Sequence, residues 1–174
     1  MAGSPPVDIP ENQLAPLHVF RFQVDFKRDT IGAGGGSDAV RLCSGAFSEC
    51  TGLEATMEAK VIKAGGMNYG PAQRVGTVTF ATVVLKRGMT RTRDLWQWFD
   101  WVAGGKYAYR LAVDITQFDT TGQPVLTWHL SRAMPVKFKA ADLNAKGTEV
   151  GIEELHLVHE GLSMSGAPTA AALV

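Results

Sequence analysis

The sequence predicts a mainly β domain, an antiparallel β-barrel or β-sandwich with one α-helix at about residues 91–103. Three observations support this fold class. Apolar and polar residues alternate along several short segments, which is the period of half-buried strands. A helical period occurs in one convincing stretch, Leu85–Gly105. Turn-forming residues separate the alternating segments without any internal repeat, and an antiparallel barrel or sandwich is the economical architecture for such a chain.

Length and charge set the outer limits of this interpretation. The 174 residues predict a single domain at 17–162, between a flexible N-terminal arm at 1–16 and a C-terminal tail of small residues at 163–174. Lys and Arg number 17, as do Asp and Glu, so no basic surface for nucleic acid is expected. No apolar run approaches the roughly 20 residues of a membrane span, and the N-terminus does not have the pattern of a signal peptide.

The first predicted strand is His18–Phe26, because its residues alternate almost without exception. One face carries the apolar side chains and the other the polar ones: Phe20, Phe22, Val24 and Phe26 against Arg21, Gln23 and Asp25. The glycine-rich stretch Lys27–Ala39 is expected to be a linker, since it has no terminal Gly-Lys-Ser/Thr for a phosphate-binding loop. A second strand is expected at Val40–Cys50, with an interruption at Ser44–Gly45.

A long polar hairpin is expected at about Glu54–Arg74. It comprises a strand at Leu53–Ala64 and a glycine-rich loop at Gly65–Gly76. Such an arm has few core residues and would need a neighbour to order it. The following strand, Thr77–Arg87, is apolar on both faces, so we expect the helix to cover one face and a subunit contact the other.

The helix has start, face and stop signals. Thr90 or Thr92 can cap its first turn, and Asp94 places a carboxylate where the helix dipole favours one. Gly104 and Gly105 can end it, because glycine readily adopts the left-handed conformation. The expected core face has i, i+3, i+4, i+7 spacing and consists of Leu95, Trp98, Phe99 and Val102.

The C-terminal half is expected to begin with a β-hairpin. Tyr109–Phe118 and Val125–Arg132 alternate, and Asp119–Gly122 between them is a turn sequence. Pro135 is expected to break the ladder before a further strand at Val136–Ala140. The last strand, Thr148–His159, changes phase, which indicates a bulge near Glu153–Glu154. The total is seven or eight strands, with the helix after the fourth or fifth.

No catalytic, metal or cofactor site is expected, and the protein is interpreted as structural and not as an enzyme. His156 and His159 have metal-ligand spacing only on a helix, whereas a strand points them to opposite faces, and the same holds for adjacent Glu153 and Glu154. No serine or cysteine lies in a nucleophile elbow. Other residues have structural explanations: Trp98 belongs to the core, Trp96 and Trp101 flank it, and Cys43 and Cys50 are free thiols.

Five segments, in this order, resemble the tail-tube proteins of contractile phages, and more closely the inner-tube proteins of phage-tail-like contractile injection systems. The segments are FSECTGLEATME (Phe47–Glu58), KAGGMNYG (Lys63–Gly70), VVLKRGMTRTRDLWQWFDWV (Val83–Val102), WHLSRAMPVKF (Trp128–Phe138) and VGIEELHLVHEGL (Val150–Leu162). The resemblance runs from about Leu17 to Leu162. It implies a β-barrel-like protomer that closes into a six-membered ring, with rings stacked into a hollow, self-assembling tube that punctures a target envelope.

The resemblance also implies partners and a location. These are further copies of the chain, a contractile sheath protein, baseplate or spike proteins, a tube-cap protein, and effector cargo in the lumen. Assembly would take place in the bacterial cytoplasm, and the virion-like particle would stay inside the cell, be anchored to a membrane or be released. Three alternatives stay open: a tail-tube protein of a contractile bacteriophage or prophage, a tube-initiating paralogue, and, from another class, a small ligand-binding β-barrel whose tryptophans line a pocket.

Two groups of residues are expected to serve assembly in such a tube. The hairpin is expected to contact the next ring through Glu54, Glu58, Lys60, Lys63, Gly65, Gly66, Asn68 and Tyr69. A polar wall would let cargo slide, and the residues expected to line the lumen are Arg21, Gln23, Asp25, Asp114 and Thr116.

Overall fold

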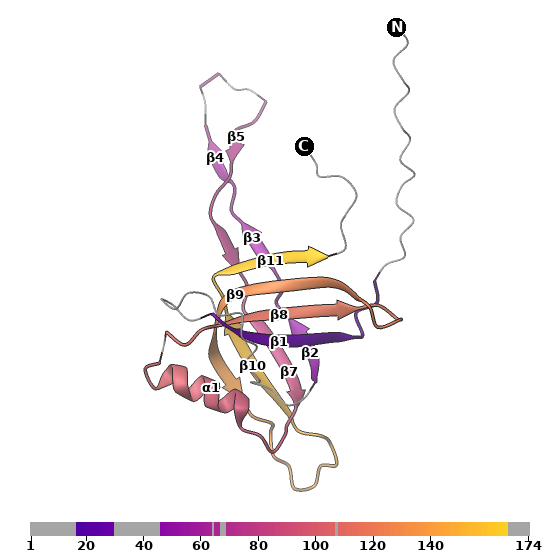
Figure 1. Ribbon diagram of the computed structural model, residues 1–174. Coiled ribbons are helices and arrows are strands. Elements are labelled where there is room, and N and C mark those ends of the chain that lie inside the picture. The colour runs from indigo at the N-terminus through magenta and orange to yellow at the C-terminus, as the bar shows by residue number, and fades with distance from the viewer. Residues whose placement is uncertain (1–16, 30–45, 64, 67–68, 107, 167–174) are drawn as a thin grey trace.

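The computed structural model describes residues 17–29, 46–63, 65–66, 69–106 and 108–166, and within them the chain forms eleven strands and one α-helix (Figure 1). In chain order the elements are β1 (Phe22–Arg28), β2 (Phe47–Thr51), β3 (Ala55–Met57), β4 (Lys60–Ile62), β5 (Ala72–Arg74), β6 (Val78–Phe80), β7 (Val83–Gly88), α1 (Asp94–Ala103), β8 (Leu111–Phe118), β9 (Pro124–Lys139), β10 (Ile152–Val158) and β11 (Gly161–Gly166).

Two antiparallel layers share the long strand β9. Its first half pairs with β8 and β11, and β8 pairs in turn with β1. Its second half pairs with β10, followed by β7 and then β2. The two layers cross in front of one another, and the strands β3–β6 project from them as an arm (Figure 1). The predicted fold class, mainly antiparallel β with one helix, is therefore confirmed.

The core lies between the two layers, because each layer presents alternate apolar side chains to the other. The buried residues of the β1–β8–β9–β11 layer are Phe26, Leu111, Val113, Ile115 and Leu130, and those of the opposite layer include Val83, Leu85, Leu155 and Leu157. Burying each such side chain contributes about 1.5–3 kcal/mol before entropy is subtracted.

Strand β9 is continuous, so the predicted break at Pro135 is wrong. The strand changes layers near Arg132, which has a φ of 50°. Pro135 lies opposite Leu157, where the register with β10 shifts between His156 and Leu157. A bulge leaves one residue unpaired, and this is where a strand can accept a proline that has no N–H to donate.

The bulge predicted at Glu153–Glu154 is also absent from the β10–β7 pairing, which is regular from Ile152 opposite Gly88 to Leu157 opposite Val83. The inward positions of β10 are Glu153, Leu155 and Leu157. The change of phase in the sequence arises because a buried position holds a glutamate, while Val150 precedes the strand and is exposed.

The helix α1 begins at Asp94, three residues later than predicted, and neither threonine caps it. Arg93 occupies the N-cap without a side-chain cap, and the hydroxyls of Thr90 and Thr92 bond to each other at 2.7 Å. At the other end the predicted stop is present, because Gly104 donates to Asp100 O and Gly105 has a φ of +100°. Leu95 and Trp98 are buried, whereas Phe99 and Val102 are half-buried.

Three other boundaries differ from the prediction. β1 starts at Phe22, so Phe20 lies outside it and is 64 % exposed. β11 continues to Gly166, beyond the expected domain limit at 162, because Leu162 and its neighbours pair with β9. β2 starts at Phe47, and the predicted strand residues 40–45 and most of the glycine-rich linker, residues 30–39, lie outside the described residues.

The predicted strand Thr77–Arg87 is split at Ala81–Thr82. Its first part, β6, pairs with β3 in the arm, and its second part, β7, pairs with β2 and β10 in the body. The chain pivots beside Gly52, whose φ is +86° and where a Cβ would lie 2.1 Å from the Thr82 carbonyl oxygen. The inner face of β7 belongs to the core that also contains Leu95 and Trp98 of α1, and its last inward residue, Arg87, pairs with Asp94 at the start of the helix.

Candidate assembly surfaces

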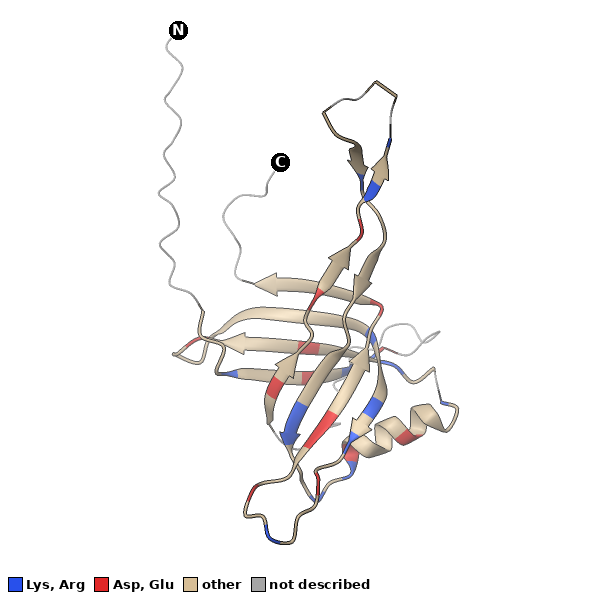
Figure 2. Ribbon diagram, turned by 180° about the vertical axis from the view of Figure 1, so that it is seen from behind, with Lys and Arg blue, Asp and Glu red and all other residues tan. Residues whose placement is uncertain are grey.

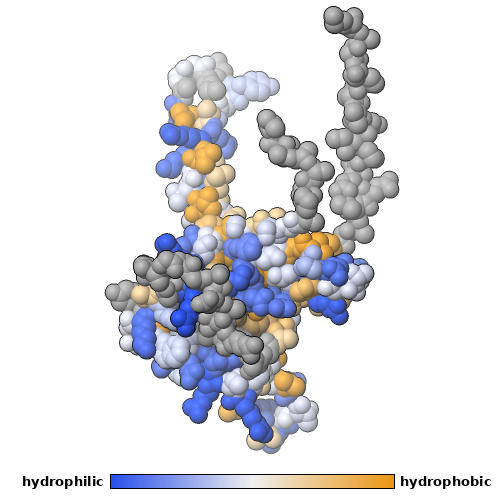
Figure 3. Space-filling view, in the orientation of Figure 1, coloured by the Kyte–Doolittle hydropathy of each residue, from blue (hydrophilic) through white to orange (hydrophobic). Residues whose placement is uncertain are grey.

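A polar face covers the outer side of the β1–β8–β9–β11 layer. Its central positions hold Gln23, Asp25, Lys27, Ala112, Asp114, Thr116, Thr127, His129, Ser131, Ser163 and Ser165. We call this surface the polar sheet face; it is turned toward the viewer in Figure 3, where hydrophilic residues dominate it. Four of the five residues expected to line a lumen lie on it, because Asp25 is opposite Asp114 and Gln23 is opposite Thr116. Arg21 precedes β1 and is exposed beside this face.

Asp114 is the centre of the polar sheet face. Lys27 Nζ lies 2.6 Å from Asp114 Oδ2, and His129 Nδ1 lies 2.7 Å from Oδ1. Burial raises the pKa of Asp114, but the hydrogen bonds from Lys27 and His129 outweigh burial and hold it below the ordinary value of 3.8. The hydrogen bond to Asp114 correspondingly raises the pKa of Lys27. Of the two carboxylates that face each other across β1 and β8, Asp114 therefore pairs with Lys27, and Asp25 accepts hydrogen bonds from the amide of Gln23.

The other ring nitrogen of His129 extends this network to β11, because Nε2 lies 2.7 Å from Ser165 Oγ. The resulting Asp114–His129–Ser165 chain has the residue types of a hydrolase triad. Ser165, however, lies within an edge strand and not on the sharp strand-to-helix turn that exposes a nucleophile. The chain of hydrogen bonds instead fixes side chains of β8, β9 and β11 across the sheet.

The arm formed by β3–β6 is the second surface. Its two short ladders, β3 with β6 and β4 with β5, have no second layer above them. Consequently its large apolar side chains are exposed: Met57, Val61, Ile62, Val75 and Val78. Exposed apolar side chains gathered on one projecting element mark an interaction surface (Figure 3).

The structure places the residues of the expected inter-ring hairpin along this arm. Glu54 and Glu58 lie near its base, Lys60 begins β4, and Gly65 and Gly66 lie at the tip. Tyr69 is fully exposed there, and Asn68 lies outside the described residues. The arm is longer than predicted, because β6 forms part of its second leg.

A buried charge cluster was not predicted. Arg87 is 1 % exposed; its Nε donates to Glu153 Oε1 at 2.5 Å, and its guanidinium pairs with Asp94 at the start of α1. The sequence carried a signal for it, because Arg87 follows Val83 and Leu85 in the same inward phase. As expected, Glu154 points away from Glu153, toward Lys139 and His156.

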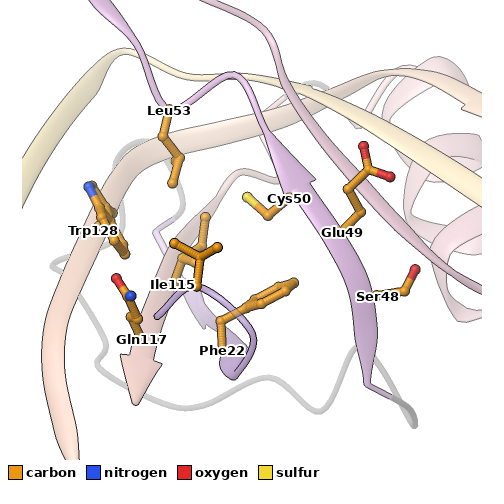
Figure 4. Close-up of a pocket in the computed structure, with 9 residues that line it drawn as sticks. Phe22, Ser48, Glu49, Cys50, Leu53, Ile115, Gln117 and Trp128 are labelled. Atoms are coloured by element: carbon orange, nitrogen blue, oxygen red, sulfur yellow. The ribbon is translucent and has the colours of Figure 1, made fainter. Parts of the chain in front are cut away.

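A pocket of about 280 Å³ opens beside β2, between the two layers (Figure 4). Its lining includes Phe22, Cys50, Leu53, Ile115 and Trp128. Burial raises the pKa of the Cys50 thiol to about 11, so this group is a neutral part of the apolar wall. The helix tryptophans do not line the pocket, and its volume is just below the usual range for small-molecule sites.

Within the described residues, no group of three or more His, Cys, Asp or Glu side chains could hold a metal ion. His156 lies beside Glu154. Burial lowers the pKa of His159, and among these residues His159 forms no hydrogen bond with another histidine. No helix among the described elements has the length and apolar character that a membrane crossing requires.

Comparison with known families gives one match. The family model of the T4-like virus tail tube protein gp19 matches residues 18–163. No curated protein sequence matches the chain.

Comparison with solved structures gives matches that span most of the chain. A chain of the cryo-EM structure of the anti-feeding prophage (AFP) baseplate, 6-fold symmetrised, is 28% identical, with a TM-score of 0.71 over 88% of this chain and 97% of that one. A chain of the sheath-tube complex of PVC, an extracellular contractile injection system, is 17% identical, with a TM-score of 0.68 over 87% and 93%. The AFP tube-terminating cap gives 17% identity and a TM-score of 0.69 over 92% and 99%. The latter two show the shared fold.

Proposed function

The chain belongs to the T4-like virus tail tube protein family, whose members are structural proteins, and from this premise we propose that six copies form a ring and that rings stack into the hollow inner tube of a contractile injection system. The tube is the conduit through which cargo crosses a punctured envelope. The observation that carries the proposal is the polar sheet face, whose outer strands β1 and β11 each have one edge that pairs with no other strand of the described residues.

These edges are complementary in direction. β1 runs antiparallel to β8, β8 to β9, and β9 to β11, so β1 and β11 are themselves antiparallel. Pairing β1 of one copy with β11 of the next would therefore continue an all-antiparallel sheet around a ring. A closed ring removes the exposed edges that otherwise favour uncontrolled association. The 6-fold symmetry of the AFP structure supports a ring of six.

In such a ring the polar sheet face lines the lumen. Lys27 and His129 contact Asp114, Asp25 accepts from Gln23, and most other side chains of the face carry hydroxyl or amide groups. Cargo would therefore meet hydrogen-bonding groups without an apolar patch on which to stick. The arm, which exposes apolar side chains and lacks its own core, contacts a neighbouring ring.

The choice of an injection system over a phage tail rests on the closer resemblance of the five sequence segments to the inner-tube proteins of contractile injection systems. The partners follow from the same likeness: a sheath around the tube, a baseplate or spike at one end and a cap at the other. In the alternative, a contractile phage or prophage, isolated particles would carry a capsid on the tube. We take the single tail-tube domain, expected at residues 17–162, to extend to Gly166, so that it includes the edge strand β11.

The test is the assembly state of the purified chain. Size-exclusion chromatography with light scattering, followed by negative-stain microscopy, is expected to show rings and tubes whose fraction grows with concentration. A compact single-chain species at every concentration, with no annuli or filaments, would contradict the proposal. Tryptophan fluorescence that responds to small ligands in such a monomer would favour a ligand-binding barrel.

A further inference from the structure

The arm has a counterpart at the opposite pole of the molecule. Figure 1 shows the β4–β5 tip at one end and the loop between β9 and β10 at the other. This loop, with the residues after β7, encloses a hollow of about 660 Å³. We call it the polar hollow; its walls include Met89 and residues 141–152.

The arm carries unneutralised positive charge. Lys60 and Arg74 are direct cross-strand partners, and like charges in that position destabilise a ladder. Lys63 follows β4 on the same arm, and among the described residues none of these three cations forms an ion pair. Val61 and Ile62, which lie between Lys60 and Lys63 in the sequence, are exposed. The tip of the arm is therefore a basic element with an apolar centre.

The lining of the polar hollow has a small excess of negative charge, with Asp142, Glu149 and Glu154 against Lys139 and Lys146. Asp142 and Glu149 are exposed on its rim, and within the described part of the chain neither has a cationic partner. Two lysines also line the hollow. Lys139 Nζ lies 3.9 Å from Glu154 Oε1, and Lys146 is exposed at the turn of the loop between β9 and β10. Figure 2 shows acidic residues on both shoulders of this loop with a basic residue between them, and basic residues on the outer arm.

Apolar side chains are exposed at this pole too. Leu143 is 88 % and Val150 75 % exposed, and both line the polar hollow. No side chain of the described residues covers them. Leu143 and Val150 are apolar, like the exposed Val61 and Ile62 of the arm. The carboxylates on the rim are opposite in charge to the cations of the arm.

We propose that the β4–β5 tip of one subunit docks into the polar hollow of a copy in the adjacent ring, with Lys60 and Arg74 facing Asp142 and Glu149. Val61 and Ile62 then contact Leu143 and Val150. This inference rests on the proposed stacking of rings and specifies its acceptor site. Donor and acceptor lie at opposite poles, so the contact is head-to-tail and repeats without closing, which is how rings become a tube.

The test exchanges the charges between donor and acceptor. The variant Lys60→Glu/Arg74→Glu and the variant Asp142→Lys/Glu149→Lys each place like charges at the contact, and both are expected to form rings but roughly tenfold fewer tubes. Combining all four substitutions restores opposite charges with the order reversed, so tube length and yield should recover. The control variants Asp100→Lys and Lys137→Glu reverse exposed charges away from both surfaces and should leave tubes unchanged.

The outcomes separate this inference from the function on which it rests. If the wild-type chain forms no rings, the proposed function fails and this inference fails with it. If wild-type tubes form and the double variants make tubes of normal length, the docking site is wrong while the tube function stands. If the fourfold variant forms intact rings but does not recover tubes, the proposed pairing of Lys60 and Arg74 with Asp142 and Glu149 is also wrong.

Discussion

Asp114 shows how a single carboxylate can hold three strands of a polar surface together. It lies on β8 and accepts hydrogen bonds from Lys27 on β1 and His129 on β9. Its side chain is 13% exposed, so the loss of its charge leaves two cationic or donor groups without their acceptor. The sequence predicted its face correctly, but these partners depend on the register of three strands.

We expect Asp114→Asn to lower the free energy of unfolding by about 1–3 kcal/mol at pH 7, because hydrogen bonds to a charged group are lost. The folded-state pKa of Asp114 is depressed, so its contribution is present above the ordinary value of 3.8 and is lost as pH falls through the folded-state pKa. Urea titrations of wild type and variant should therefore converge as the pH falls through the folded-state pKa, below the ordinary value of 3.8. A constant difference at all pH values would show that the charge is not the cause.

Cys50 illustrates burial acting on a nucleophile. Its pKa of about 11, against an ordinary 9.0, implies that alkylation or disulfide exchange at pH 8 is about a hundredfold slower in the folded chain than after denaturation. The measurement is the rate of reaction with a chromogenic disulfide in a Cys43→Ser background, which leaves one thiol. Equal rates in folded and denatured protein would contradict the burial of this side chain in the pocket wall.

At the scale of elements, Arg87 joins three segments that are distant in sequence. It belongs to β7, pairs with Glu153 on β10 and holds Asp94 at the first turn of α1. This explains why α1 starts at Asp94 without a threonine cap. The acidic residue is where the helix dipole favours it, and a buried guanidinium fixes the helix against the sheet.

We expect Arg87→Ala to cost about 3–5 kcal/mol of stability, because it leaves the buried Glu153 without its cation. Arg87→Met combined with Glu153→Gln should recover much of that loss, since it removes both charges and keeps the volume. Arg91→Ala, an exposed neighbour, should stay within about 0.5 kcal/mol of wild type. Thermal and urea unfolding followed by circular dichroism measure these differences, and additive effects of the two core substitutions would argue against the pair.

The arm is the element whose stability most depends on assembly. Deleting its tip, Gly65–Gly70, removes contacts with the next ring and leaves the body intact, so rings are expected without long tubes. Electron microscopy of tube lengths is the measurement, and the body is checked by the unchanged unfolding midpoint. Tubes of normal length would show that stacking depends on another surface.

At the scale of the whole molecule, the lumen hypothesis concerns the charge that cargo meets. Removing the carboxylate at Asp25 or Asp114 is expected to change cargo loading while tubes still assemble. The structure makes Asp25→Asn the cleaner substitution. Within the described residues the Asp25 side chain accepts hydrogen bonds only from the neutral amide of Gln23, whereas Asp114 also supports the sheet. Cargo per tube, quantified by mass spectrometry, tests it; failed assembly of Asp25→Asn would assign the residue to ring contacts.

The sequence by itself determined the fold class, the one helix, the hairpin turn at Asp119–Gly122 and the faces of β1 and β8. These features follow from local periodicity and turn chemistry, which are written in neighbouring residues. Tertiary structure alone decided what depended on partners distant in sequence. The bulge opposite Pro135, the split at Thr82 beside Gly52 and the buried Arg87–Glu153 pair each require a second segment. A single-sequence pattern records the phase of a side chain but not the neighbour that makes a buried charge or an interrupted strand stable.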